Sequence, residues 1–186
     1  MGGGQPGSEE IVRSETIYAG KLLTLRRDQV RLESGREATR EVVLHPGAVA
    51  VVPLLPNGRV VMVRQYRHAA GRALLEIPAG TLDQQGESAE DAVARELQEE
   101  TGYRAAHLAP LVTFYTAPGF CTERISLFLA TGLTRGEQTM MDDEAIMIEE
   151  IALADLPALI ARGEIADAKT LTGLLLAQNH RSPVGA

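Results

Sequence analysis

Three glutamates, Glu96, Glu99 and Glu100, lie within one short segment of the chain that has helical periodicity. At about 100° per residue, Glu96 and Glu100 fall nearly in line on one face of a helix, and Glu99 lies beside them. Carboxylates this close repel one another, and a cation bound among them relieves that repulsion. Oxygen ligands favour a hard ion such as Mg²⁺ or Mn²⁺, so the spacing predicts a divalent metal site. The alternative is an ordinary amphipathic helix with a solvated acidic face.

The residues around these glutamates predict a loop, a helix and a helix end. Ser88 followed by Asp91 is typical of an acidic variant of the capping box at a helix N-terminus. Gly102 is a natural helix stop. The positions that should pack on the core form an apolar stripe beside the glutamates, namely Ala89, Ala92, Val93 and Leu97.

The same segment resembles the Nudix box, whose pattern is G-x5-E-x7-R-E-U-x-E-E-x-G-U, with U a bulky apolar residue. The residues that match are Glu87, Arg95-Glu96-Leu97, Glu99-Glu100 and Gly102-Tyr103. From Glu87 onward the match has no gap. Six residues rather than five separate Gly80 from Glu87, which we interpret as one extra residue in the loop before the helix.

Further segments resemble the ADP-ribose pyrophosphatase branch of the Nudix superfamily. They are residues 40–51, 64–67, 75–80, 117–119, 122–124 and 142–146. The resemblance extends over roughly residues 14 to 178 and implies hydrolysis of ADP-ribose to AMP and ribose 5-phosphate. Two alternatives remain open: a Nudix hydrolase of another nucleoside diphosphate sugar, and a non-catalytic ADP-ribose sensor. The intact glutamates of the box favour an enzyme over a sensor.

The resemblance also implies roles for individual acidic residues. The implied metal ligands for Mg²⁺, with Mn²⁺ as a substitute, are Glu96, Glu99, Glu100, Glu144 and the carbonyl of Ala79. The implied catalytic residues are Glu99, Glu100, Asp142 and Glu144. Asp142 stands where some relatives place a glutamate proposed as general base, and it is one methylene shorter. Glu144 has a second interpretation, as one residue of a solvated acidic turn. Arg95 is implied to orient Glu87 or a ligand glutamate.

Four residues are implied to contact a small nucleoside diphosphate sugar. Arg67 resembles a diphosphate contact, Arg40 a residue that reaches the site of a partner subunit, and Glu123 a residue near the terminal ribose. Gly119 belongs to the loop beside the substrate, although Pro118-Gly119 would also suit a simple turn. Arginine is mostly a surface residue, so Arg40 and Arg67 have surface positions as their alternative interpretation.

Composition excludes several other classes of protein. The 186 residues carry a net charge of −7 and a pI near 5.2, which disfavours nucleic acid as a partner. No apolar run approaches the roughly 18 residues of a membrane span. Cys121 is the only cysteine and forms no internal disulfide, which indicates a cytoplasmic location.

The order of elements predicts an α/β fold, a Nudix α/β/α sandwich around a mixed sheet with an N-terminal antiparallel β subdomain. We expect residues 1–13 to be a flexible tail, 14–45 the β subdomain and 46–180 the Nudix domain. In the last helix, 168–179, we place Leu171, Leu174 and Leu175 on the apolar side.

A small β subdomain is marginal alone and needs a surface to pack against. We therefore expect a homodimer in which residues 14–44 cross to the partner and deliver Arg40 to its site. The apolar residues expected at this contact are Leu23, Leu25, Val30 and Leu32. The alternative is a monomer whose N-terminal strands fold back on their own subunit.

Overall fold

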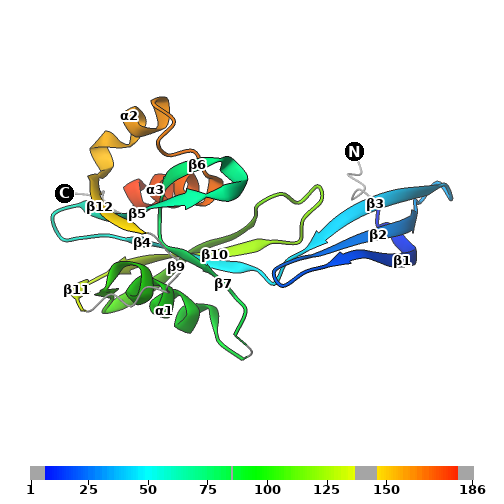
Figure 1. Cartoon of the computed structure of the whole chain (residues 1–186), viewed down its shortest axis with the longest axis horizontal. Coiled ribbons are helices and arrows are strands. Elements are labelled where there is room, and N and C mark those ends of the chain that lie inside the picture. Colours follow the sequence, from blue (N-terminus) through cyan, green and yellow to red (C-terminus); the bar gives the residue numbers. More distant parts are fainter. Residues whose placement is uncertain (1–6, 85, 137–145, 180–186) are drawn as a thin grey trace, which may run out of the picture. The chain divides into compact units, whose positions relative to one another are not determined.

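Three consecutive strands near the N-terminus form one antiparallel sheet in the order β1-β2-β3 (Figure 1). They are β1 (Glu10–Ala19), β2 (Thr24–Arg31) and β3 (Glu37–Leu44). The computed structural model describes residues 7–84, 86–136 and 146–179. Residues 10–13, which we expected in a flexible tail, belong to the sheet. The strands are eight to ten residues long, so the sheet is larger than the small subdomain we expected.

A loop distant in sequence joins this sheet. The Val43 N–H donates to the Phe120 carbonyl at 2.7 Å, and the Thr122 N–H donates to the Val43 carbonyl at 2.9 Å. Tyr115–Glu123 and Met1–Gly47 together make one unit, called the N-terminal unit below. The predicted subdomain of 14–45 therefore contains β2 and β3 and most of β1 but lacks this loop.

The second unit, called the main unit, comprises Ala48–Phe114 and Arg124–Ala186 and is built on a mixed sheet of order β7-β4-β10-β9. These strands are β4 (Ala48–Pro53), β7 (Ala79–Thr81), β9 (His107–Tyr115) and β10 (Arg124–Thr131). The strand β4 pairs in parallel with β10 and antiparallel with β7. The predicted mixed sheet is therefore confirmed.

Every residue of β4 is buried, because helices cover both faces of this sheet. Successive side chains of a strand point to opposite faces. Val52 enters the core that includes α3 (Ala168–Asn179), whereas Val51 enters the core that includes α1 (Ala89–Thr101). Figure 1 shows α1 and α3 on opposite sides of the sheet. This arrangement confirms the predicted α/β/α sandwich.

A second, antiparallel sheet of order β12-β5-β6 lies in the layer that contains α3 (Figure 1). Its strands are β5 (Arg59–Arg67), β6 (Arg72–Glu76) and β12 (Met147–Ala152). The shorter elements are η1 (His68–Ala70), η2 (Leu153–Asp155), α2 (Leu156–Ala161) and the paired strands β8 (Tyr103–Arg104) and β11 (Thr134–Arg135). No helix in the described part of the chain is long and apolar enough to cross a membrane.

The helix α1 begins and ends where its sequence predicts. The Ser88 Oγ accepts the Asp91 N–H at 3.1 Å, and the same hydroxyl donates to Asp91 Oδ2 at 2.6 Å. Gly102 has a left-handed φ of 71°, and its N–H donates to the Gln98 carbonyl at 2.8 Å. Because both ends are stopped by local contacts, the glutamates between them have a defined helical phase.

The helix α3 approaches the mixed sheet closely at Gly173. A Cβ at this position would lie 2.9 Å from Val52 Cγ2 and 3.0 Å from Ile77 Cδ1. Leu174 is fully buried, whereas Leu175 is 52% exposed, so its predicted place on the apolar side was wrong. The buried positions follow the helical period rather than the leucines, and they are Thr170, Gly173, Leu174 and Ala177.

Replacing Gly173 by leucine should lower the free energy of unfolding by about 1–3 kcal/mol, because the added side chain overpacks the contact with β4. Urea denaturation measures this change. The matched control is Leu175→Ala on the exposed side of the same helix, with an expected change within about 0.5 kcal/mol. Equal losses in the two variants would contradict the close packing of α3 at Gly173.

Candidate functional site

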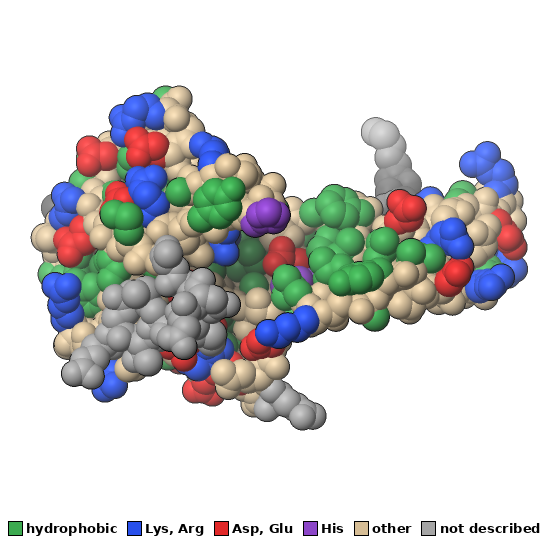
Figure 2. Space-filling view, viewed as in Figure 1, with side chains coloured by type: hydrophobic (Ala, Val, Ile, Leu, Met, Phe, Trp, Pro, Cys, Tyr) green, Lys and Arg blue, Asp and Glu red, His purple; other side chains and the backbone are tan. Residues whose placement is uncertain are grey.

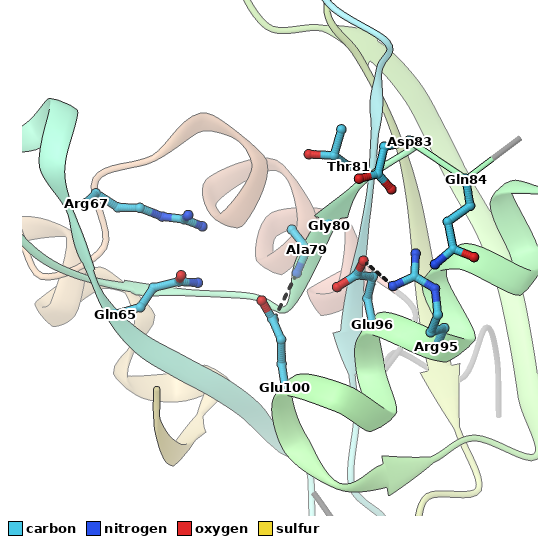
Figure 3. Close-up of a pocket in the computed structure, with 10 residues that line it drawn as sticks. All are labelled: Gln65, Arg67, Ala79, Gly80, Thr81, Asp83, Gln84, Arg95, Glu96 and Glu100. Carbon is cyan, nitrogen blue, oxygen red and sulfur yellow. Dashed lines mark hydrogen bonds and ion pairs between the residues drawn. The ribbon is translucent and has the colours of Figure 1, made fainter. Parts of the chain in front are cut away.

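A cleft of about 370 Å³ in the main unit collects polar side chains from three elements and one loop (Figure 3). Its lining residues are Gln65 and Arg67 of β5, Ala79, Gly80 and Thr81 of β7, Asp83 and Gln84 of the following loop, and Arg95, Glu96 and Glu100 of α1. Glutamates from α1 therefore face an arginine of β5 across the cleft. This combination suits a ligand that carries both a cation and phosphate groups.

Arg95 holds together the acidic residues at one end of the cleft. Its Nε and Nη2 donate to the two carboxylate oxygens of Glu87 at 2.9 and 3.1 Å. Its Nη1 donates to Glu96 at 2.7 Å and to Glu99 at 2.9 Å. The predicted role of Arg95 in orienting Glu87 and a glutamate of the cluster is therefore seen in the geometry.

These contacts shift the acidity of both partners. The hydrogen bond from Arg95 lowers the pKa of the Glu87 carboxyl below its ordinary value. The hydrogen bond to Glu87, with the charges of the other glutamates, raises the pKa of Arg95 above its ordinary value despite partial burial. Arg95 therefore remains a cation and Glu87 a carboxylate at neutral pH.

Glu96 and Glu100 both meet the backbone of β7. The Glu100 side chain is buried, and its Oε2 accepts the Ala79 N–H at 3.2 Å. The Glu96 carboxylate lies against Gly80, where a Cβ would come within 1.9 Å of Glu96 Cδ. Glycine at position 80 therefore makes room for a carboxylate beside the strand.

The predicted metal ligands Ala79, Glu96 and Glu100 are brought together at the cleft, and Glu99 is tied to Glu96 through Arg95. Within the described residues, no group of three or more histidine, cysteine or acidic side chains has converged to hold a metal ion. The donors available are all oxygens, which matches the preference of Mg²⁺. The side chains thus fit a hard cation in chemistry, and their metal-binding roles stay predictions.

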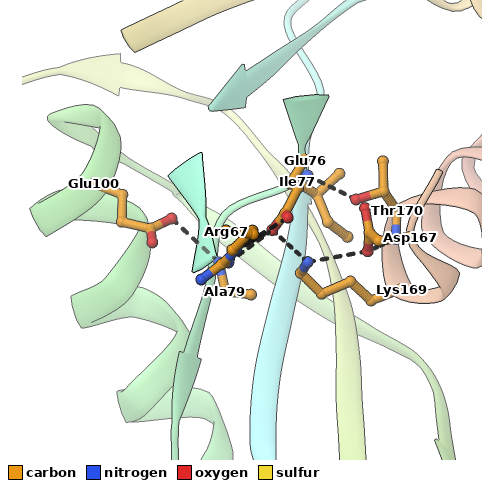
Figure 4. A network of polar contacts seen from close by, with 8 residues as sticks. All are labelled: Arg67, Glu76, Ile77, Ala79, Glu100, Asp167, Lys169 and Thr170. Carbon is orange, nitrogen blue, oxygen red and sulfur yellow. Dashed lines mark hydrogen bonds and ion pairs between the residues drawn. The ribbon is translucent and has the colours of Figure 1, made fainter. Parts of the chain in front are cut away.

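The predicted substrate residue Arg67 lines the cleft, and its guanidinium is paired with Glu76, a residue that we did not predict at the site. Its Nη2 donates to Glu76 at 2.7 Å, and Lys169 of α3 donates to the same carboxylate at 2.6 Å (Figure 4). Glu76 is a single charge within the apolar run 74–77, and a charged residue in such a run signals a buried partner. Gln65 also lines the cleft, and we did not predict it as a site residue.

The other predicted substrate residues belong to the N-terminal unit, whereas the cleft is lined entirely by the main unit. Arg40 Nε donates to Glu9 at 3.0 Å. Glu123 accepts the hydroxyl of Thr116 at 2.7 Å. A Cβ at Gly119 would meet no atom within 4 Å. The substrate-binding roles of Arg40, Gly119 and Glu123 stay predictions.

His45 lies 3.6 Å from Glu123 through its Nδ1, a distance that would allow an ion pair. The same nitrogen accepts the Gly47 N–H at 3.1 Å, so the His45 side chain helps to form the turn that leads to β4. The predicted catalytic residues Asp142 and Glu144 lie outside the described residues.

Comparison with known families agrees with this fold. The family model described as NUDIX domain matches residues 44–174, and the one described as nucleoside diphosphate sugar hydrolase N-terminal domain matches residues 9–43. The chain therefore belongs to the Nudix family. The two matches meet close to the boundary between β3 and β4, where the N-terminal sheet passes into the main unit.

Individual relatives extend this similarity over most of the chain. The ADP-ribose pyrophosphatase of Mycobacterium tuberculosis is 45% identical over 168 residues, which cover 89% of this chain and 81% of the relative. The ADP-ribose pyrophosphatase of Bacillus subtilis is 41% identical over 164 residues, covering 87% and 88%. A crystal structure of an ADP compounds hydrolase superposes with a TM-score of 0.85 at 23% identity, covering 95% and 96%, and supports the fold.

Replacing Arg95 by methionine should raise the pKa of Glu87 toward its ordinary value, because the hydrogen bond that lowers it is removed. An NMR titration of the glutamate carboxyl carbons in metal-free protein measures the shift. Arg104→Met is the matched control, since Arg104 Nε donates to Gln98 and not to the acidic cluster. An unchanged Glu87 titration in Arg95→Met would contradict the bridging role of Arg95.

Proposed function

We propose that the protein is a Mg²⁺-dependent hydrolase that cleaves the diphosphate of ADP-ribose to give AMP and ribose 5-phosphate. The observation that carries this proposal is the cleft in which Glu96 and Glu100 of α1 face Arg67 of β5. Two ADP-ribose pyrophosphatases that are 41% and 45% identical support the choice of substrate. The single cysteine, Cys121, fits the reducing cytoplasm.

The glutamate cluster would hold the cation. In this proposal Glu96, Glu99, Glu100 and the carbonyl of Ala79 bind Mg²⁺, joined by Glu144 from outside the described residues. The bound ion supplies neutralisation of the diphosphate charge and activation of a water molecule. Asp142 or Glu144 takes the proton from the attacking water as general base.

Arg67 and Arg95 supply positive charge at the cleft in addition to that of the metal ion. Arg67 uses Nε and Nη2 on Glu76, which leaves Nη1 for a phosphoryl oxygen of the substrate. Arg95 offsets part of the negative charge of Glu87, Glu96 and Glu99 through its ion pairs with them. The negative charge that develops at phosphorus is thus met by fixed positive groups already in place.

A hydrolysis panel in Mg²⁺ tests the substrate. It contains ADP-ribose, GDP-mannose, other UDP- and ADP-sugars, and dinucleoside polyphosphates. We expect the highest kcat/KM with ADP-ribose and equal amounts of AMP and ribose 5-phosphate as products. A higher kcat/KM with another nucleoside diphosphate sugar would make that sugar the preferred substrate, while the class of reaction would stay as proposed. Binding of ADP-ribose without turnover of any compound would indicate a sensor.

Replacing either Glu96 or Glu100 by glutamine should lower kcat about 100-fold or more, because the side chain keeps its size and loses its charge. Steady-state kinetics over a range of Mg²⁺ concentrations measure the effect. Glu90→Gln is the matched control, since Glu90 is exposed in the first turn of the same helix. Near-normal kcat and unchanged metal dependence in both variants would remove these residues from the metal site.

We also propose a homodimer formed through the N-terminal strands. Every residue of the edge strand β1 is exposed, and its exposed apolar side chains are Ile11, Val12, Ile17 and Tyr18. A long edge strand with apolar side chains is the kind of surface that proteins cover by pairing with another chain. Val30, which we expected at this contact, is buried within its own chain, so β1 replaces it in the proposal.

In such a dimer, residues 14–44 of one chain would deliver Arg40 to the site of the other. Mixing inactive Arg40→Ala chains with inactive Glu100→Gln chains should then restore activity at one of the two sites of each mixed dimer. Light scattering gives the mass, and a tag on one chain shows that subunits have exchanged. Proven exchange without recovered activity would place Arg40 outside the partner's site, and a fully active monomer would exclude the shared site altogether.

A further inference from the structure

A buried carboxylate connects the cleft to the helix α3. Glu76, at the end of β6, is 1% exposed. Its oxygens accept three hydrogen bonds from Arg67, at 3.0 and 3.2 Å from Nε and 2.7 Å from Nη2. Lys169 Nζ donates to Glu76 Oε2 at 2.6 Å and to Asp167 at 3.0 Å. Figure 4 shows Glu76 between its two cations.

The two cations of Glu76 have different surroundings. The Arg67 side chain is 40% exposed and lines the cleft, whereas the Lys169 side chain is 13% exposed and is not among the lining residues. Lys169 also belongs to a helix that is tied to the residue directly after β6, because the Thr170 hydroxyl accepts the Ile77 N–H at 3.0 Å. Lys169 therefore ties Glu76 to α3, and Glu76 in turn holds the Arg67 side chain at the cleft.

The carboxylate form of Glu76 is maintained in spite of its burial. Burial opposes the charge, but the hydrogen bonds and charges of Arg67 and Lys169 outweigh it and lower the pKa of Glu76 below its ordinary value. The hydrogen bond to Glu76 likewise raises the pKa of Arg67. The pair is thus ionised throughout the neutral range.

The geometry of the pair leaves one edge of the guanidinium for a ligand. Glu76 occupies Nε and Nη2 of Arg67, and within the described residues no hydrogen bond involves Nη1. A free arginine side chain loses rotamer entropy when a ligand fixes it. An arginine that is already held by a carboxylate has met most of that cost before the ligand binds.

We infer that Glu76 is a positioning residue, which fixes Arg67 so that its Nη1 meets a phosphoryl oxygen of a nucleoside diphosphate. The inference rests on the proposed function, in which Arg67 contacts the diphosphate. The competing explanation is that Glu76 only fastens β6 to α3 and has no influence on substrate. The two explanations differ in whether the effect of Glu76 passes through Arg67.

The test compares Glu76→Gln, Arg67→Ala and the double variant in the full-length protein with ADP-ribose or the best substrate of the panel. Both single variants should raise KM about 10-fold or more with a smaller change in kcat, because a contact made before the transition state is weakened. Adding Glu76→Gln to Arg67→Ala should change kcat/KM by less than about twofold, since Glu76 acts only through Arg67.

Thr170→Val is the matched control for a purely structural role. It removes the hydroxyl that accepts the Ile77 N–H, so it weakens the tie between α3 and the end of β6 without removing a partner of Glu76 or Arg67. It should lower the denaturation midpoint in urea as Glu76→Gln does, while KM stays within about twofold of the original enzyme. Glu76→Asp keeps the charge on a side chain one methylene shorter and should give an intermediate KM. If Glu76→Gln fails to fold, this variant carries the comparison with Arg67→Ala.

The outcomes separate the inference from the function on which it rests. A normal KM in the Glu76 variants, additive losses in the double variant, or an equal rise of KM in Thr170→Val would overturn the positioning role while Arg67→Ala still raises KM. A normal KM in Arg67→Ala would remove Arg67 as a diphosphate contact, and both proposals about this arginine would fail together.

Discussion

The acidic face of α1 depends on Arg95, whose single positive charge offsets part of the negative charge of three carboxylates. Glu87, Glu96 and Glu99 each accept hydrogen bonds from the same guanidinium, which links the loop before the helix to two positions along it. Without a cation, three like charges at this spacing would destabilise the helix. The contact of the preceding loop with the helix and the orientation of the Glu96 carboxylate beside Gly80 both involve this one arginine.

Two buried glutamates connect the layers of the sandwich on either side of the cleft. Glu100 joins α1 to the backbone of Ala79 on β7, and Glu76 joins β6 to Lys169 on α3. Burying a charge is costly unless it is paired, and Glu76 has two cations as partners, Arg67 and Lys169. Because the pKa of Glu76 is lowered in the folded protein, its contribution to stability is present above the unfolded pKa of about 4.3 and is lost as the pH falls below it.

The N-terminal unit and the main unit differ in how far their strands are buried. The main unit buries its strand β4 completely between helices, whereas every residue of the edge strand β1 is exposed. The buried Asp28 is satisfied inside the N-terminal sheet, where Ser14 donates to it and Arg26 lies 2.7 Å away. The buried carboxylate is thus paired within the sheet. In the proposed dimer, the exposed apolar side chains of β1 are the surface that a second chain would cover.

The sequence by itself determined what local spacing controls. It predicted the capped helix α1, the position of its glutamates and the mixed sheet covered on both faces, because helical phase and strand alternation are set within a few residues. The role of Arg95 was implied by the resemblance to the Nudix box. Only the tertiary structure decided the partners of Arg67, the burial of Glu76 and Lys169, and the exposure of Leu175. Glu76 and Lys169 lie 93 residues apart in the chain, and a contact over that distance depends on how α3 docks on the sheets, which no local pattern records.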